Sequence, residues 1–198
     1  MKGIVLFACL ILTCFGQQGH AKEKVQIINM KPSAPSEWRE YLDFRREEVL
    51  STLYSLKPEA RGVIARAKGY AVFTNFGMKI LFFGSGNGRG ILRNAKTGKD
   101  TYMRMFQAGV GLGMGMKDFR MVFVFENSKV LKNFAKGGWK FGTDADLAIK
   151  AEDSGAATSG SIRVAPGLRV YQLTENGLAL NAMVNGTKYW IDSHVNKK

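Results

Sequence analysis

The sequence predicts an α+β protein, with an N-terminal helical segment followed by a large, mainly antiparallel, curled β-sheet and one short helix inserted in it. Three observations predict this class. Apolar residues recur at helical spacing between residues 36 and 56. After Gly69 the pattern changes to short apolar strands separated by turn residues. Glycines then alternate within the predicted strands, which favours close backbone packing or sharp curvature of the sheet.

Residues 1–21 have the composition of a secretory signal peptide. Lys2 makes the start positive, the next 14 residues carry no charge, and small residues precede a cleavage site after Ala21. The uncharged run is shorter than the roughly 20 residues that span a bilayer. We therefore expect export across the inner membrane and a periplasmic or envelope-associated protein. A lipoprotein attached through Cys14 is the alternative.

Cleavage after Ala21 removes both cysteines, and His194 is then the one histidine that remains. This composition argues against cysteine nucleophiles, Cys/His zinc sites and a Ser-His-Asp triad, because His194 lies near a C-terminus that we expect to fray. Asp144 and Asp146 share one predicted strand face. Such a pair could serve acid/base chemistry or bind calcium, but we interpret it as a solvated face. We expect no enzyme, cofactor or metal site.

The helical elements come first. Residues 22–35 contain two prolines and form a leader, and Ser36 is the expected N-cap of a helix that runs to Leu56. Pro58 fits the first turn of a second helix, which ends at Gly69. The face of the first helix that we expect to be buried is mostly apolar and comprises Trp38, Tyr41, Leu42, Arg45, Val49, Leu53 and Leu56.

The remaining elements are predicted strands with one inserted helix. The helix covers 128–137 and begins at Asn127 or Ser128. A tight turn is expected at Glu175–Gly177. The expected strands are 70–76, 78–84, 89–94, 101–116, 117–126, 139–142, 144–152, 161–165, 168–175 and 178–186.

Two glycine quartets lie at alternate positions in 84–90 and 109–115. Neither matches a phosphate-binding glycine motif, so we interpret both as sites of close packing or curvature. The polar segment 84–90 leaves a second interpretation open, namely an exposed loop that displays Asn87 and Arg89.

The positive charge is concentrated in one part of the chain. The formal net charge is +13, and residues 61–140 hold 15 basic and three acidic side chains, whereas 22–60 and 141–198 are each neutral. The excess of basic residues in 61–140 predicts an anion-binding face. The alternative is a basic protein with a generally solvated surface, because neighbouring residues in a strand point to opposite faces.

Several segments together resemble the SYLF-domain family of lipid-binding domains. They are PEARGVIARAKGYAVF (58–73), GSGNGRGILRN (84–94), TGKDTYMRM (97–105), GVGLGMGMKDFRMVFVFEN (109–127), WKFGTDADLAIKA (139–151) and APGLRVYQLTENGLALNAMVNGTKYW (165–190). The resemblance covers about 58–192 in order and is strongest to secreted bacterial members. It implies four segments: a signal peptide (1–21), a leader and helix (22–57), a SYLF-like domain (58–192) and a C-terminal tail (193–198).

The resemblance implies association with acidic lipids and no established enzymatic activity. Eukaryotic members bind phosphoinositides, and some bind and bundle actin. Their lipid-binding segment includes a basic amphipathic helix ahead of the sheet, which corresponds to 58–68 here. This sequence lacks the adaptor modules of those relatives, such as an SH3 domain. We do not expect actin as a partner in the compartment of an exported bacterial protein.

We therefore expect a non-enzymatic, peripheral binder of anionic phospholipid at the bacterial envelope. A protein-binding or self-associating structural envelope protein is the alternative, and its partner would be another envelope protein. Nucleic acid is not an expected partner, because no reading motif is present. The oligomeric state and the lipid are left open. The residues expected to bind lipid are Arg61, Arg66, Lys68, Arg89, Arg93, Lys96, Lys99 and Arg104.

Overall fold

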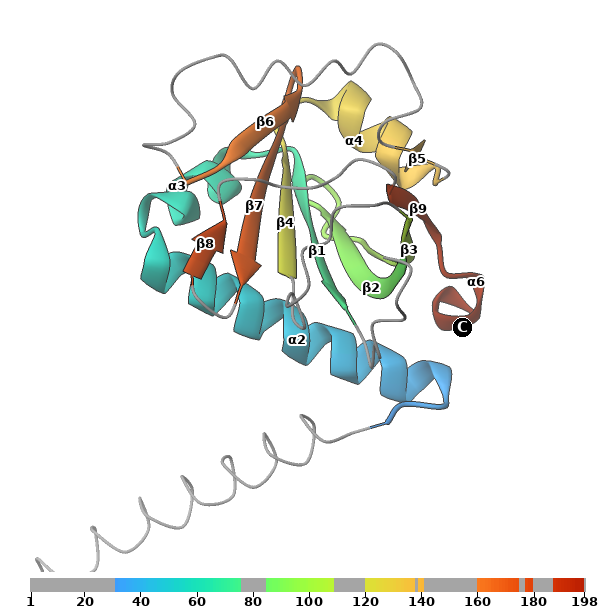
Figure 1. Ribbon diagram of the computed structural model, residues 1–198. Helices are drawn as coiled ribbons and strands as arrows, with labels where there is room; N and C mark the ends of the chain where they lie inside the picture. The colour runs from blue at the N-terminus through green and yellow to red at the C-terminus, as the bar shows by residue number, and fades with distance from the viewer. Residues whose placement is uncertain are drawn as a thin grey trace, which may run out of the picture.

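The computed structural model describes residues 31–75, 85–108, 120–137, 139–140, 160–174, 177–179 and 187–197. These residues form an N-terminal helical part followed by a curled antiparallel sheet with a short helix against it (Figure 1). The predicted α+β class is confirmed.

Helices α2 (Pro35–Leu56) and α3 (Glu59–Arg66) precede the sheet, and α2 runs across one of its faces (Figure 1). The N-cap of α2 is Ala34, so the expected cap at Ser36 is wrong. Pro35 suits the first helical position, where no amide hydrogen is needed. The Glu37 carboxylate accepts hydrogen bonds from the amides of Ser33 and Ala34, at 2.8 and 3.2 Å, and these bonds lower its pKa.

The sheet pairs its strands in the order β5-β9-β3-β2-β1-β4-β7-β6, with β8 beside β7, and every pair is antiparallel. The strands are β1 (Gly69–Asn75), β2 (Ser85–Asn94), β3 (Asp100–Ala108), β4 (Arg120–Phe125), β5 (Trp139–Lys140), β6 (Ile162–Ala165), β7 (Leu168–Thr174), β8 (Gly177–Ala179) and β9 (Thr187–Ile191).

Several sequence predictions fall outside the described residues. They include the strands expected at 78–84 and 144–152, the glycine quartet at 109–115, and Asp144 with Asp146. Strand β9 was not among the predicted strands, yet it pairs with both β3 and β5.

One half of the core lies between the inner face of the sheet and α4 (Ser128–Ala135). Asn127 caps α4 as expected, because its side chain accepts a hydrogen bond from the Val130 amide at 2.8 Å. The Phe73 ring lies 4.8 Å from the Tyr189 ring, between centroids, and both side chains are fully buried. Burial raises the pKa of Tyr189, which therefore stays a neutral member of the core.

The other half of the core lies between α2 and the opposite face of the sheet. Val49 and Leu53 of α2 pack with Val72 and Val122, and all four are buried. Strand alternation explains the arrangement, because Val72 and Phe73 point to opposite faces of β1 and join different halves of the core.

The described part of the first glycine quartet, from Gly86 to Gly90, lies in a strand rather than in a loop. Residues 85–94 form β2, and Gly88 and Gly90 are buried in it. A Cβ at Gly90 would clash with the Val72 carbonyl oxygen and lie 2.6 Å from Cδ1 of Phe73. The close-packing interpretation is therefore confirmed here. The alternative of an exposed loop that displays Asn87 and Arg89 is wrong for the loop and for Arg89, because both residues lie in β2 and 18% of the Arg89 side chain is exposed. Asn87 is exposed, as that alternative expected.

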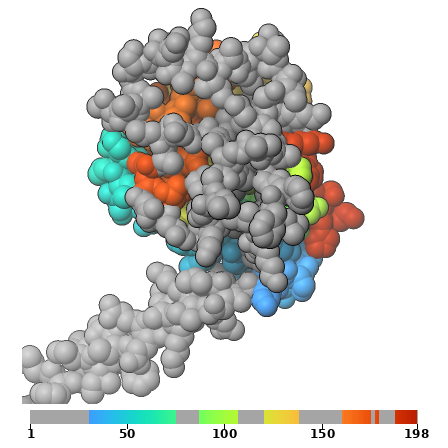
Figure 2. Space-filling model, in the orientation of Figure 1, coloured from blue at the N-terminus to red at the C-terminus, as the bar shows by residue number. Residues whose placement is uncertain are grey.

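The C-terminal residues form a docked helix. Residues 193–198 were expected to be a tail, but Ser193–Asn196 form α6. The Asp192 carboxylate accepts hydrogen bonds from the amides of His194 and Val195, and the Val195 side chain is fully buried against α2. Figure 2 shows α3 and α6 on opposite sides of the molecule.

None of the described helices combines the length and the apolar character that crossing a membrane would require.

Candidate functional site

The structure separates the eight predicted site residues into several groups. Arg61 and Arg66 lie on α3, and Lys68, Lys96 and Lys99 lie at one end of the sheet. Arg89 and Arg104 lie together near the start of α2. Arg93 forms an ion pair with Asp100.

The three lysines lie near one another because of two backbone hydrogen bonds at the end of the sheet. The Lys68 amide donates to the Phe125 carbonyl at 2.8 Å, and the Ala95 amide donates to the Lys68 carbonyl at 3.1 Å. These bonds fix Lys68 beside the turn that joins β2 to β3. The Asn94 side chain shapes that turn by accepting hydrogen bonds from the amides of residues 96 and 97.

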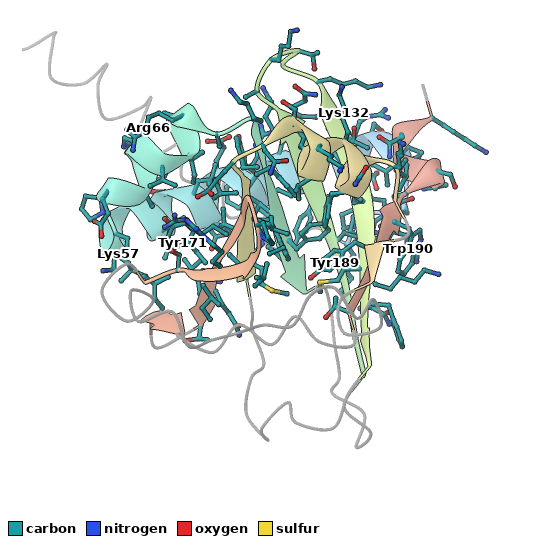
Figure 3. The ribbon with its side chains drawn as sticks, turned by 90° about the horizontal axis from the view of Figure 1, so that it is seen from above. Lys57, Arg66, Lys132, Tyr171, Tyr189 and Trp190 are labelled. Carbon is teal, nitrogen blue, oxygen red and sulfur yellow. The ribbon has the colours of Figure 1, made fainter. Side chains whose placement is uncertain are left out.

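Helix α4 adds a fourth lysine to this end of the sheet. A cavity of about 400 Å³ is lined by Lys68, Lys96 and Lys132. A second cavity of about 700 Å³ is lined by Lys99 and again by Lys132. Figure 3 shows Lys132 and Arg66 on the same side of the molecule, on α4 and α3. We call Lys68, Lys96, Lys99 and Lys132 the basic edge.

The basic edge has an unbalanced positive charge within the described part of the chain. All four lysines are exposed, and no carboxylate oxygen of a described residue lies within 4.0 Å of their amino groups. Asp100 lines the larger cavity, but its carboxylate is held by two arginines. Four like charges on three elements produce a positive potential there, which attracts anions.

Sequence reasoning missed Lys132. The sequence does predict the helix 128–137, with Val130, Leu131 and Phe134 facing inward. Lys132 therefore lies on the outward face of this helix. The sequence did not show that the helix packs beside the β2–β3 turn, so it did not indicate that Lys132 lies near Lys96.

The arginines of α3 are near the basic edge in sequence but are arranged differently. Arg61 is exposed, and its guanidinium carbon lies 4.4 Å from the centre of the Tyr54 ring. Arg66 is exposed at the end of the helix, two residues before Lys68. Arg66 therefore precedes the basic edge in the chain without lining either of its cavities, whereas Arg61 is engaged by an aromatic ring.

Arg93 belongs to an internal ion network. Its Nη2 donates to Oδ2 of Asp100 at 2.6 Å, and its Nε donates to Oδ1. Arg46 Nη1 donates to the same carboxylate at 2.9 Å. The hydrogen bonds that Arg93 donates to Asp100 raise the pKa of Arg93. Burial raises the pKa of the neighbouring Asp43, and the Asp100 charge acts in the same direction.

Arg89 and Arg104 lie in a separate pocket with two tryptophans. Arg89 stacks on Trp38, with 3.6 Å between its guanidinium carbon and the ring centre, and Arg104 lies 5.9 Å from the centre of the Trp190 ring. The cavity between them measures about 240 Å³. Burial lowers the pKa of Arg89. The residues of this pocket line neither cavity of the basic edge.

The His, Cys, Asp and Glu residues that the structure describes include no group of three or more arranged to hold a metal ion.

Comparison with known proteins gives a relative but no matching family model. No family model matches the chain. The chain is similar to a protein named Beta cell expansion factor A from Aeromonas veronii, with 32% identity over 171 residues. The aligned region covers 86% of this chain and 63% of that protein, so the chain spans less than two thirds of its relative.

Proposed function

We propose that the protein is a non-enzymatic, peripheral binder of anionic phospholipid, and that the basic edge is its membrane-contacting surface. The observation that supports this is the convergence of Lys68, Lys96, Lys99 and Lys132 from three segments, with no described carboxylate oxygen within 4.0 Å of their amino groups. Lysines suit this task, because their charges reach out on flexible stems toward a surface rather than fixing one geometry.

The expected strength of binding follows from the number of lysines. A basic residue near an anionic membrane contributes about 1 kcal/mol, so the basic edge with Arg66 gives about 5 kcal/mol. Binding of this strength is weak and reversible. Because exposed charges are screened within about 10 Å at 0.1 M salt, it is also strongly salt-dependent.

The proposal extends to family and location. The resemblance to SYLF domains implies a lipid-binding helix at 58–68, and Lys68 at the end of that segment belongs to the basic edge. We propose membership of that family, export through the 1–21 segment and action at the bacterial envelope. The name of the Aeromonas veronii relative describes an effect on beta cells and gives no ligand, so the proposal rests on the residues above.

Co-sedimentation with vesicles tests the proposal. The purified protein is mixed with neutral vesicles or with vesicles that contain phosphatidylglycerol, at low and at high salt. We expect sedimentation with the anionic vesicles and its loss at high salt. The test variant replaces Lys68, Lys96 and Lys132 by Glu, and the control variant replaces the exposed Lys31, Arg163 and Lys197 by Glu.

Both variants change the net charge by the same amount, so they separate a specific surface from general basicity. We expect the test variant to lose most binding and the control variant to keep most of it. Equal losses in the two variants would contradict a role of the basic edge. Binding that is undiminished at high salt, or no binding to any vesicle, would overturn the lipid proposal.

A further inference from the structure

Two arginines face each other on neighbouring strands with one carboxylate between them. Arg89 of β2 and Arg104 of β3 are directly opposite in the strand register. Like charges in this arrangement destabilise a sheet. Oδ2 of the buried Asp192 lies 3.2 Å from Nε of Arg89 and 4.0 Å from Nε of Arg104. One carboxylate neutralises one guanidinium, so a positive charge remains.

A third cation lies beside Trp190. Lys188 lies on the same face of β9 as Trp190, which is opposite Arg104, and its amino group lies 5.8 Å from the centre of the Trp190 ring. Two arginines and one carboxylate therefore leave a net positive charge, and Lys188 lies beside the same tryptophan as Arg104. Such an imbalance is costly in a partly buried site unless another anion completes it.

Aromatic rings form the walls of the pocket. Trp38 lies against Arg89, Trp190 lies beside Arg104, and the cavity that these four residues help to line measures about 240 Å³. Trp38 stacks on the guanidinium of Arg89, whose side chain is 18% exposed, whereas 51% of the Arg104 side chain is open to solvent. A charge that enters such a place interacts more strongly than it would in bulk water.

Arg89 also holds an unused hydrogen-bond donor. Its Nη1 is buried and has no acceptor among the residues that the structure describes. A buried donor of a charged group without a partner costs more than an ordinary missing hydrogen bond. The lowered pKa of Arg89 agrees with this, since burial opposes its charge and Arg104 repels it. An anionic oxygen in the cavity would relieve both effects.

We propose that the pocket formed by Trp38, Arg89, Arg104 and Trp190 binds a phosphate group, either free phosphate or the headgroup of a phospholipid. Guanidinium groups pair with phosphate through two parallel hydrogen bonds, and the positive charge that Asp192 leaves unbalanced complements a phosphate anion. The cavity is large enough for this group with a short substituent. The pocket shares no residue with the basic edge, so the two proposals stand independently.

Tryptophan fluorescence reports on this site directly, because two of the three tryptophans of the chain line it. The purified protein is titrated with inorganic phosphate at constant ionic strength, with chloride as the balancing anion. We expect a saturable change at millimolar phosphate or below. Trp139→Phe should keep this change, whereas Trp190→Phe should reduce it.

Two matched variants test the residues. Arg104→Gln should weaken phosphate binding at least about tenfold, since it removes a charged pair of hydrogen bonds. Lys132→Gln removes the same charge at the basic edge and should leave phosphate binding unchanged. The Arg104 side chain is half exposed, so variants at this position should fold. Arg104→Lys keeps the positive charge but lacks the planar guanidinium, so it should bind phosphate with intermediate strength.

A second arm separates the two sources of phosphate. If soluble phosphate saturates the site, free phosphate is sufficient. If the fluorescence changes only with phosphatidylglycerol vesicles, and Arg104→Gln abolishes that change, a lipid headgroup is the ligand. The absence of a saturable response in both arms, or a response that Arg104→Gln leaves intact, would overturn the proposal. The phosphate titration does not test the basic edge. The variant with Lys68, Lys96 and Lys132 replaced by Glu should bind soluble phosphate as the parent protein does.

Discussion

Gly90 of β2 lies directly opposite Phe73 of β1, and the Phe73 ring occupies the space that a side chain at position 90 would need. The ring can lie flat over the neighbouring strand only because glycine has no Cβ. From this position it makes edge contacts with Phe123 and Tyr189, at 5.7 and 4.8 Å between ring centres. The aromatic half of the core therefore depends on one small residue in β2.

We predict that Gly90→Ala lowers the free energy of unfolding by about 2 kcal/mol, because the new methyl group displaces the Phe73 ring and meets the Val72 carbonyl. Urea denaturation measures this. Gly62→Ala on α3 is the control. Its methyl group would meet only the flexible guanidinium of Arg66, so it should be neutral or stabilise by up to about 1 kcal/mol. Equal effects of the two substitutions would contradict the packing argument.

The second prediction concerns the carboxylate of Asp100, which binds both Arg93 and Arg46. Asp100→Ala should lower the free energy of unfolding by about 2 kcal/mol, because two partly buried guanidinium groups lose their shared counter-charge. Denaturation in urea at neutral pH gives the value. Glu59→Gln breaks a pair with Lys57 on the surface and should cost less than about 0.5 kcal/mol. If Asp100→Ala is as mild as Glu59→Gln, the network does not stabilise the fold.

The third prediction is a pH dependence. Burial and the charges of Asp43 and Asp100 raise the pKa of Tyr102 to about 12, and its hydroxyl donates to Oδ2 of Asp43 at 3.4 Å. An unfolded tyrosine titrates near 10. As the pH rises from 10 to 12 the unfolded state therefore loses this proton first, and stability that is complete below pH 10 is lost.

Tyr102→Phe has no proton to lose at this position, so its unfolding free energy should fall less steeply than that of the parent between pH 10 and 12. Urea denaturation at a series of pH values provides both curves. Their difference isolates Tyr102 from the other tyrosines and from lysine. Parallel curves across this range would show that Tyr102 titrates alike in the folded and unfolded states.

The fourth prediction concerns the docking of α6. Val195 is fully buried against Trp38 and Leu42, and the Arg39 side chain donates to its carbonyl oxygen at 2.9 Å. Val195→Ala should lower the free energy of unfolding by about 2 kcal/mol through lost burial and the cavity left behind. His194→Ala, at an exposed neighbouring position, should have little effect. A Val195→Ala variant as stable as the parent would indicate that the C-terminal helix is dispensable.

Local sequence signals were sufficient for the long elements. Helical spacing and two punctuating residues, Pro58 and Gly69, predicted α2 and α3 almost to their ends. Asn127 predicted the start of α4 because its side chain can cap a helix by itself. Period-two alternation predicted β4, whose side chains belong to two halves of the core.

Local signals failed where an element is held by distant partners. Strand β9 is short and exists through its pairing with β3 and β5. The α6 segment was expected to be a tail, but Asn196 accepts a hydrogen bond from the Tyr102 amide and donates one to the Tyr102 carbonyl. Bonds between residues so far apart in the sequence leave no periodic pattern near either one.

The sequence by itself determined that the positive charge of the protein is concentrated between residues 61 and 140, and it predicted strands for most of this region. Only the tertiary structure decided what each charge does. Arg93 pairs with Asp100, and its charge is neutralised. Arg89 lies in a tryptophan-lined pocket, and Lys96 lines a cavity together with Lys132 at the end of the sheet. The physical reason is that strand pairing and helix docking set the neighbours of a charge, and those neighbours determine whether it is balanced or available to a ligand.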